Sequence, residues 1–350
     1  MKMIAVIIVT WNGREMLRTC LSALHKQTVH NFRVICIDNG STDGSQEMVR
    51  QLFPSVQMIP LPKNEGFADP NNRGIRLALQ EPNVSAVVTL NNDTVVAPNY
   101  LEEMIACSER HPQAGSIQPN VLRSFPNAVI DATGILIYPD MSAINRGQGE
   151  KDKGQYEKEE EVFGASASAA LYTREALEDC ALKNGEFFDE DYFAYYEDVD
   201  LAFRMRLRGY LSYYTPRAIV HHKHSATGKS SSPFKSFYIH RNQYFNILKN
   251  LPFRILLFAF IFFPFRYFLL FSSILRKKGP SARLVQNARG GILLIVLQSW
   301  RDIILHLPSI LRKRKYIQTH KRVQTSTIQG WFRTYRASLI RIIYGETSSA

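Results

Sequence analysis

Apolar runs and helical patterns alternate through the first hundred residues. Met3–Val9 is apolar at every position and rich in β-branched residues, which predicts a strand buried on both faces. Residues 17–24 then place apolar side chains at helical spacing. The alternation continues with predicted strands at 32–37, 56–59 and 84–90 and with helices through 48–52 and over 71–79. Strands and helices at this interval predict an α/β fold with a mostly parallel, Rossmann-like sheet flanked by helices.

Beyond residue 100 the pattern weakens and then returns. Residues 141–162 are charged and glycine-rich, and we expect them to form a loop over the sheet. Small residues over 165–171 predict a strand, 174–182 a helix and 210–214 a further strand. An acidic and aromatic stretch, Phe187–Asp200, lies between that helix and that strand.

The composition changes near residue 228. Residues 229–350 hold 21 Lys and Arg and only two acids, whereas the whole chain has a net charge of +12. Helices are predicted at 234–248, 254–275 and 292–307. The uncharged run over 255–265 is shorter than the roughly 20 residues of a membrane span, and Arg266 follows it, so we expect 254–275 to be an interfacial or re-entrant segment, with a true span as the alternative.

We therefore predict two parts, an α/β domain over 1–228 and a helical, basic, membrane-associating region over 229–350. A chain that ends near residue 230 should then fold as a soluble domain. The basic cluster at 312–315 beside apolar helices is typical of binding to an anionic membrane surface, although a solvated face on a core helix would have the same composition. No recognised nucleic-acid motif accompanies the charge, so we expect no nucleic acid partner.

The cysteines and the N-terminus bear on location. Four separated Cys without a CxxC pair fit a reduced cytosolic protein, and no secretory segment is recognised at the N-terminus. Together with the basic tail, this predicts the cytoplasmic face of the cell membrane.

Polar clusters follow three of the predicted strands, at 10–12, 38–43 and 91–93. Ligands of parallel sheets bind beyond the carboxyl ends of the strands, so we expect these clusters to share one cleft. Asp38 could accept a hydrogen bond from a nucleobase, or it could cap a turn. Asp93 could hold Mg²⁺ or Mn²⁺ against a diphosphate, or it could belong to a turn.

Two later clusters are also candidates for chemistry. Glu197, Asp198 and Asp200 fall within four residues, where the dipole of a helix that begins there would favour them. The neighbouring aromatic residues suggest instead partly buried acids, which are costly unless they are used or paired. Three histidines at 221, 222 and 224 end the segment, and His222 is a candidate metal ligand with a structural role as the alternative.

In order and spacing these motifs resemble the inverting family-2 glycosyltransferases with the GT-A fold, over about residues 3–228. The closest resemblance is to the rhamnosyltransferase-like branch, which builds surface polysaccharides on polyprenyl diphosphate. The matching segments are VIIVTWN at 6–12, IDNGSTDG at 37–44, NEGFA at 64–68, LNNDT at 90–94, the 164–175 segment, YYEDVDL with Arg204 at 195–204, and Pro216 to His222.

The resemblance implies a role for each matching position. Thr10 and Asp38 contact the donor nucleoside, with Asp38 at the base. Asp93 holds a divalent metal, Mg²⁺ or Mn²⁺, with His222 as a further ligand. Asp198 is the general base, with Glu197 as its neighbour. The other donor-binding positions are Asn12, Asn64, Gly66, Phe67, Asn92 and Arg204, the last beside the acidic pair or the diphosphate.

The implied reaction is transfer of a sugar, with inversion, from a nucleotide donor to a polyprenyl-diphosphate-linked or polysaccharide acceptor. Deoxythymidine-diphosphate rhamnose is the first donor expected and a UDP-hexose the second. Two departures from the family pattern leave a non-catalytic, membrane-bound scaffold open: a single acid, Asp93, at the metal motif, and Asp69-Pro70 in place of paired glycines. A dinucleotide-dependent oxidoreductase is disfavoured because no GxGxxG follows the first strand.

Overall fold

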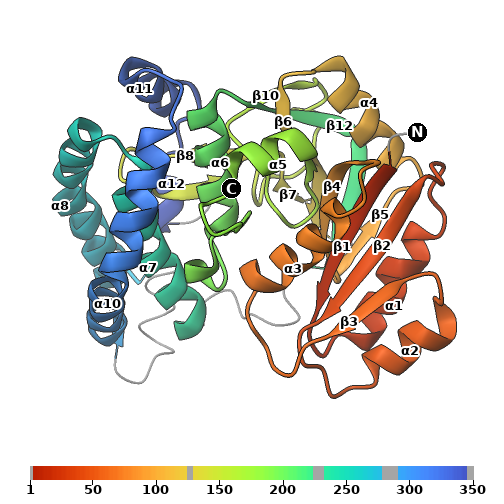
Figure 1. Cartoon of the computed structure of the whole chain (residues 1–350). Coiled ribbons are helices and arrows are strands. Elements are labelled where there is room, and N and C mark those ends of the chain that lie inside the picture. The colour runs from red at the N-terminus through yellow and green to blue at the C-terminus, as the bar shows by residue number, and fades with distance from the viewer. Residues whose placement is uncertain (1–2, 124–128, 224–231, 278–290, 345–350) are drawn as a thin grey trace.

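The computed structural model describes residues 3–123, 129–223, 232–277 and 291–344. His224 and the predicted boundary at residue 228 lie outside these ranges. Figure 1 shows a sheet with its helices on one side, coloured red to orange, and a group of helices coloured cyan to blue on the other, with α6 between them.

Four parallel strands form the first half of the sheet. β1 (Met3–Thr10) lies between β2 (Phe32–Asp38) and β4 (Val84–Asn91), and β3 (Gln57–Pro60) pairs with the outer side of β2. The register places Thr10 opposite Asp38 and Val9 opposite Asn91. The carboxyl ends of these strands therefore meet at one edge, as the sequence predicts.

The second half of the sheet is mixed. β11 (Leu171–Thr173) lies antiparallel between β4 and β6 (Ala114–Arg123), and β12 (Leu211–His222) continues parallel to β6. The described strands of this sheet number ten. The shorter strands are β5 (Thr94–Val96) and β10 (Glu160–Val162) on β12, β7 (Ile130–Ala132) on β6, and the separate pair β8 (Ile135–Ile137) and β9 (Ala143–Asn145).

Helices cover both faces of the sheet because its central strands are apolar on both sides. On β1, Ile4, Val6 and Ile8 join one core cluster, and Ala5 and Ile7 join another. The first cluster packs beneath α1 (Arg14–Leu24), α2 (Ser45–Leu52) and α4 (Tyr100–Arg110), and the second beneath α3 (Ala68–Leu79), α5 (Arg174–Cys180) and α6 (Glu197–Arg208). This arrangement confirms the predicted mostly parallel α/β fold.

The structure differs from two of the predicted elements. The strand expected over 165–171 begins only at Leu171, because the N–H groups of Ser166 and Ala167 bind the side chains of Gln118 and Asp198 instead of a strand partner. The loop expected over 141–162 has short strands, β9 and β10, near its two ends.

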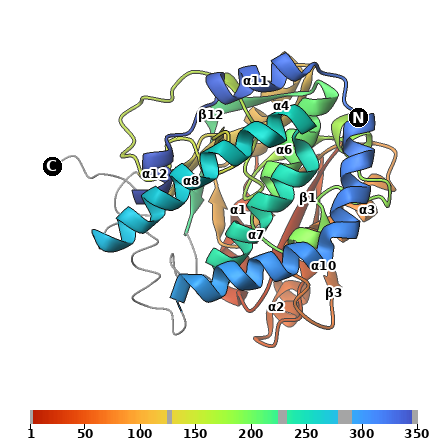
Figure 2. The same cartoon turned by 90° about the vertical axis from the view of Figure 1, so that its left-hand side faces the viewer.

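Helices form the remainder of the chain. They are α7 (Pro233–Asn250), α8 (Phe253–Leu275), α10 (Gly291–Thr319), α11 (Thr325–Thr334) and α12 (Leu339–Tyr344). Figure 2 shows α7, α8 and α10 over the near side of the molecule, in front of the sheet. Phe203 of α6 shares one apolar core with Phe245 of α7 and Trp331 of α11.

Buried ion pairs also join these helices to the first part of the chain. The Lys249 ammonium on α7 is fully buried, contacts Asp189, and lies 3.0 Å from the Asp200 carboxylate. Lys313 on α10 binds Asp189 at 2.5 Å and Asp191 at 2.9 Å. Lys313 of the basic cluster at 312–315 is therefore paired with acids inside the protein instead of facing solvent. The two predicted parts share a core.

Candidate active site

The loops that follow β1, β2 and β4 are tied together by their polar side chains. The Asn92 amide donates to the Thr10 hydroxyl at 2.9 Å. Asn12, in a left-handed conformation with φ of 48°, donates its N–H to Ser41 Oγ at 2.9 Å and accepts from the Thr42 N–H at 2.8 Å. The structure thus brings the predicted donor-binding residues Thr10, Asn12 and Asn92 to one edge of the sheet.

Asp38 lies at the same edge, but its carboxylate faces inward. It is fully buried, and it accepts from the Gln46 amide at 2.5 Å and from the Ser41 N–H at 3.2 Å. These contacts fasten the turn between β2 and α2, which is the capping role considered as the alternative. Contact between Asp38 and a nucleobase stays a prediction.

The predicted nucleotide loop at 64–68 is held by Asn39, a residue that the sequence analysis did not single out. The Asn39 amide donates to Asn64 Oδ1 at 3.0 Å and to the Gly66 carbonyl at 2.8 Å, and its oxygen accepts from the Glu65 N–H at 2.8 Å. The IDNGSTDG motif therefore fixes the neighbouring loop as well as its own turn. Its position directly after Asp38 was the available signal.

Close packing joins this loop to the segment before α6. Gly66 has φ of 84°, and a Cβ there would overlap the Phe193 carbonyl oxygen. The Phe67 N–H donates to that same oxygen at 2.5 Å. Only glycine allows both the left-handed backbone and this close approach. The predicted nucleotide loop at 64–68, called the donor loop below, therefore packs against the segment that leads into Glu197 and Asp198, the acidic pair.

Glu197 and Asp198 are the first two residues of α6. Asp198 accepts from the Ala167 N–H at 3.3 Å and from the Val199 N–H at 2.8 Å. The next residue, Ser168, accepts from the Asn91 N–H at 2.8 Å at the end of β4. Asp198 is therefore tied to the strand end that carries the predicted metal motif.

Burial governs the protonation of this acidic pair. Burial raises the pKa of Asp198, and the N–H donors of Ala167 and Val199 offset part of that rise. Burial, followed by the charge of Asp198, raises the pKa of Glu197 well above its usual range. Glu197 Oε2 also has no hydrogen-bond partner among the described residues. We infer that Glu197 keeps a proton over a wider pH range than Asp198.

The two predicted metal ligands lie in contact. His222 Nε2 is 3.0 Å from Asp93 Oδ1, and each side chain is 12% exposed. His222 Nδ1 is 2.8 Å from Asp131 Oδ2. Burial opposes protonation of this imidazole, but hydrogen bonds to Asp131 and Asp93 outweigh it and raise the pKa of His222 to about 10.

These residues fit a divalent cation. A carboxylate and an imidazole are suitable ligands for Mn²⁺, and their ligand atoms already converge. A carboxylate on the other ring nitrogen is the usual arrangement around a metal-bound histidine, and Asp131 provides it. Asp131 is in the three-residue strand β7, and nothing in the sequence pattern distinguished it.

Comparison with known proteins decides the family. The sequence pattern described as "Glycosyl transferase family 2" matches residues 5–181, just over half of the chain. The chain belongs to this family. It is a glycosyltransferase, as the sequence motifs predict.

Individual relatives agree with the family. The glycosyltransferase is 29% identical over 244 residues to N-acetylglucosaminyl-diphospho-decaprenol L-rhamnosyltransferase of Mycobacterium tuberculosis (strain ATCC 25618 / H37Rv). The matched stretch covers 64% of this chain and 77% of the relative. It is 23% identical over 219 residues to poly-beta-1,6-N-acetyl-D-glucosamine synthase of Staphylococcus aureus (strain COL), which covers 62% of this chain and 48% of that protein.

A solved structure shares the fold. GalNAc-T7 with UDP, GalNAc and Mn²⁺ superposes with a TM-score of 0.53 at 17% identity, over 69% of this chain and 47% of that chain. Together with the family match and the sheet order, this likeness shows that the glycosyltransferase has a GT-A-like fold.

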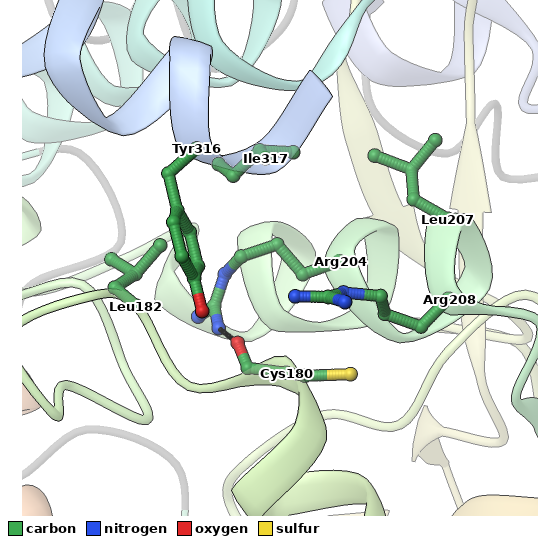
Figure 3. A pocket seen from close by; sticks show the side chains of 7 residues that line it. All are labelled: Cys180, Leu182, Arg204, Leu207, Arg208, Tyr316 and Ile317. Carbon is green, nitrogen blue, oxygen red and sulfur yellow. Dashed lines mark hydrogen bonds between the residues drawn. The ribbon is translucent and has the colours of Figure 1, made fainter. Parts of the chain in front are cut away.

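Arg204 differs from its predicted place at the donor. Figure 3 shows it on α6 beside Cys180, at a crevice of about 10 Å³, which is far too small for a nucleotide. Its guanidinium is 3% exposed and binds Asp200 at 2.8 Å and two main-chain oxygens, those of Cys180 and Phe187. All three contacts are internal, so Arg204 orients Asp200 and the 180–187 segment instead of the diphosphate or the Glu197–Asp198 pair.

A second group of residues that could ligate a metal lies at the opposite end of the strands, near the start of β6. Ligand atoms of Cys107, His111 and Glu159 lie within 4.8 Å of one another. His111 follows α4 and precedes the start of β6, whereas Asp93 follows the end of β4. Arg110 binds Glu159 through two nitrogens, at 3.0 and 2.5 Å. The guanidinium of Arg110 therefore already balances the charge of the carboxylate in this cluster.

Proposed function

We propose that this glycosyltransferase moves a sugar, with inversion, from a nucleotide donor to a lipid-linked or polysaccharide acceptor, with Asp198 as the general base. The observation that carries the proposal is the tie between the Asp198 carboxylate and the end of β4. Ala167 binds Asp198, and the adjoining Ser168 binds Asn91, two residues before Asp93. A base and a diphosphate-binding carboxylate would then face the same bound donor.

In the proposed reaction Asp198 removes the proton of the acceptor hydroxyl. The oxygen forms a bond to the anomeric carbon while the bond from that carbon to the diphosphate oxygen breaks, and the nucleoside diphosphate departs with the electron pair. Attack from the face opposite the leaving group inverts the anomeric centre. A positioned base contributes roughly 10²- to 10⁴-fold to such a step. Glu197, holding its proton, would leave Asp198 as the ionised member of the pair.

Asp93 and His222 would hold the divalent cation, Mg²⁺ or Mn²⁺. When bound, the cation supplies positive charge that stabilises the departing diphosphate. Asp131 would fix the orientation of the His222 ring through Nδ1. The imidazole must release its proton before it can ligate, so cation binding competes with protons at this site.

For the donor we propose deoxythymidine-diphosphate rhamnose first and a UDP-hexose second. The name of the M. tuberculosis relative, an L-rhamnosyltransferase of a decaprenol diphosphate, supports a rhamnose donor and a polyprenyl-diphosphate-linked acceptor. Thr10, Asn12 and Asn92 lie at the strand ends, where we propose that they would contact the nucleotide. The remaining proposed lining is Asn64, Gly66 and Phe67, and Asp38 at the end of β2 is proposed at the nucleobase.

A nucleotide-sugar panel tests this proposal. We expect dTDP-rhamnose with Mn²⁺ to raise the melting temperature of the full chain, because a ligand at 100 times its Kd adds about 2.7 kcal/mol to the free energy of unfolding. We also expect slow donor hydrolysis that EDTA suppresses. The measurements are differential scanning fluorimetry and release of dTDP, with rhamnose 1-phosphate as the control that lacks the nucleoside.

The outcomes separate the alternatives. Stabilisation by UDP-glucose or UDP-N-acetylglucosamine and not by dTDP-rhamnose would select the second donor class. Stabilisation without hydrolysis or transfer would favour the non-catalytic scaffold. Unchanged turnover in EDTA would remove Asp93 and His222 from metal binding.

We also propose that the helical region rests on an anionic membrane surface at the cytoplasmic face. Exposed apolar side chains recur every three or four residues along α8 and along α10, so each helix has an apolar stripe directed away from the core. On α8 they are Phe253, Leu257, Ile261, Phe265, Phe268, Phe271 and Leu275, and on α10 they include Leu293, Leu297, Trp300, Ile304, Leu307 and Leu311. Exposed Arg312 and Lys315 add positive charge beside the second stripe.

Contacts with the catalytic part support helices that lie along the membrane. By length and composition, residues Leu293–Thr319 of α10 could cross a bilayer. However, Asp302 in the middle of α10 binds Arg241 at 2.7 Å, and Ser309 binds Asp191 at 2.7 Å. In α8, Arg266 binds the fully buried Asp140 at 3.2 Å. A spanning helix would have to give up these contacts, so an interfacial position agrees better with the structure.

Vesicle flotation tests the membrane proposal. We expect the chain to float with vesicles that contain 30% phosphatidylglycerol and to bind less in 0.5 M salt, because exposed charges are screened. The double variant Phe265→Glu, Phe268→Glu should lower binding at least tenfold, whereas Leu52→Glu at an exposed position of α2 should not. Equal flotation of the double variant and the native chain would contradict the assignment of the α8 stripe.

A further inference from the structure

The segment directly before the acidic pair has an unusual backbone. Phe193, Tyr195 and Tyr196 all have left-handed φ, at 62°, 68° and 70°. Such conformations cost a non-glycine residue about 1–3 kcal/mol each, and they persist only where the surrounding structure imposes them. Among the described residues these are three of six non-glycine positions with positive φ, and they fall within four residues.

A single side chain from the helical region supplies much of that constraint. The Asn242 amide on α7 is fully buried and donates to the carbonyls of Tyr192 at 3.1 Å, Ala194 at 2.9 Å and Tyr195 at 2.6 Å. The oxygen of this amide accepts from Arg241 Nε at 2.8 Å. Asn242 thus draws three carbonyls of the loop, those of Tyr192, Ala194 and Tyr195, toward one point.

Arg241 holds the same loop through further main-chain hydrogen bonds. Its guanidinium donates to the carbonyls of Asp191 at 2.7 Å and Tyr192 at 2.9 Å, and it binds Asp302 of α10 at 2.7 Å. The loop is therefore fixed from the α7 side by main-chain bonds that depend little on the loop's own side chains.

The same loop touches both functional halves of the candidate site. On one side, the Phe193 carbonyl accepts from the Phe67 and Ala68 N–H groups of the donor loop, at 2.5 and 3.4 Å. On the other side, Tyr196 caps α6, and its carbonyl accepts from the Asp200 N–H at 2.9 Å in the first turn. A change in the loop would therefore move the donor loop and the acidic pair relative to each other.

We propose that Asn242 is a positioning residue for sugar transfer, which sets the Glu197–Asp198 pair against the donor loop through the carbonyls of Tyr192, Ala194 and Tyr195. This inference rests on the proposed function. It makes the helical region part of the catalytic machinery, because a group on α7 fixes the geometry of acids on α6. Displacements of about 1 Å in such arrangements cost on the order of 100-fold in rate.

Asn242→Asp tests the proposal. The substitution preserves shape but directs a carboxylate oxygen at three carbonyl oxygens, so the loop must shift. We expect kcat for hydrolysis of dTDP-rhamnose, or of UDP-N-acetylglucosamine if that is the donor, to fall at least tenfold. The donor KM should change less than threefold, because the proposed contacts from Thr10, Asn12 and Asn92 lie at strand ends that Asn242 does not touch.

Gln243→Glu is the matched control. It makes the same amide-to-acid change at the next buried position of α7, where the amide binds the Asp140 carbonyl and Ser142 instead of the acidic loop. Both variants should melt at lower temperature than the native chain, but only Asn242→Asp should lose kcat at 20 °C. Asn242→Ser, which keeps one donor, should be intermediate and carries the test if Asn242→Asp does not fold.

The outcomes are distinct from those of the proposed function. A native chain without turnover on any donor contradicts the proposed function. Hydrogen exchange at residues 193–200 then tests only whether Asn242 holds the loop. Unchanged protection of these amides in Asn242→Ser would contradict that constraint. In an active enzyme, kcat of a folded Asn242 variant equal to that of Gln243→Glu would overturn the positioning role.

Discussion

Asp198→Asn should lower the rate of sugar transfer by roughly 10³-fold while nucleotide binding persists, because the amide cannot accept the proton of the acceptor hydroxyl. The substitution preserves an oxygen that can accept from the Ala167 or Val199 N–H, so α6 should keep its first turn. The measurement is transfer or donor hydrolysis by the purified chain, beside calorimetric binding of dTDP or UDP with Mn²⁺.

The pH profile gives this prediction a second test. Because burial raises the pKa of Asp198, the acid limb of kcat/KM should lie above the usual aspartate range of about 3.9. Activity should fall as the pH drops through that raised pKa, because only the ionised carboxylate is a base. Asp179→Asn on α5, which removes a carboxylate that binds Arg322 at 2.7 Å, should leave the profile unchanged. Near-native turnover in Asp198→Asn would refute the assignment.

Lys249→Met should lower the free energy of unfolding by about 3–5 kcal/mol, because it removes the cation that two fully buried carboxylates share and leaves each of them with only one other cation, Lys313 beside Asp189 and Arg204 beside Asp200. Lys249 contacts Asp189 and Asp200, and all three side chains are fully buried. Its ammonium also lies 4.3 Å from the centre of the Tyr192 ring. Urea unfolding at pH 7 measures the loss, with Lys315→Met as a control at an exposed lysine of α10.

The sign of the pH dependence follows from the two aspartates. Burial alone would raise the pKa of Asp189 and of Asp200, but the nearby cations, Lys249 foremost, outweigh it and hold both below their usual values. Their contribution to stability is therefore present above the unfolded pKa of about 3.9 and is lost as the pH falls through the lowered folded values. The difference between the native chain and Lys249→Met should shrink below about pH 4. A difference under 1 kcal/mol at pH 7 would contradict the role of this ion pair.

The same network changes what we expect of a shortened chain. A chain that ends near residue 230 would lack Lys249 and Lys313, the cations that balance Asp189. It would also expose the face of α6 that packs on α7 and α11. We therefore expect such a chain to unfold or aggregate, although composition alone favours a separable domain.

Local signals were sufficient for the parallel first half of the sheet and for the strand ends at which the candidate site lies, but they missed β6 and the short strands of the second half. Met3–Val9 is apolar on both faces, which requires helices on both faces, and that pattern depends on no distant contact. Because parallel strands end at one edge, the polar residues after β1, β2 and β4 were bound to meet. The direction in which Asp38 points, by contrast, depends on Gln46, and Arg204 turns inward because Asp200 and two carbonyls bind it.

By itself, the order of residues determined the α/β layers, the family and the strand ends at which a nucleotide sugar would bind. The tertiary structure decided how the acidic pair is held. Asn242 and Lys249 are 47 to 60 residues from the carbonyls and carboxylates that they bind, and no periodicity in the sequence links them. Composition records only that residues 229–350 are basic, because a charge count cannot distinguish a lysine that faces a membrane from one buried against two aspartates.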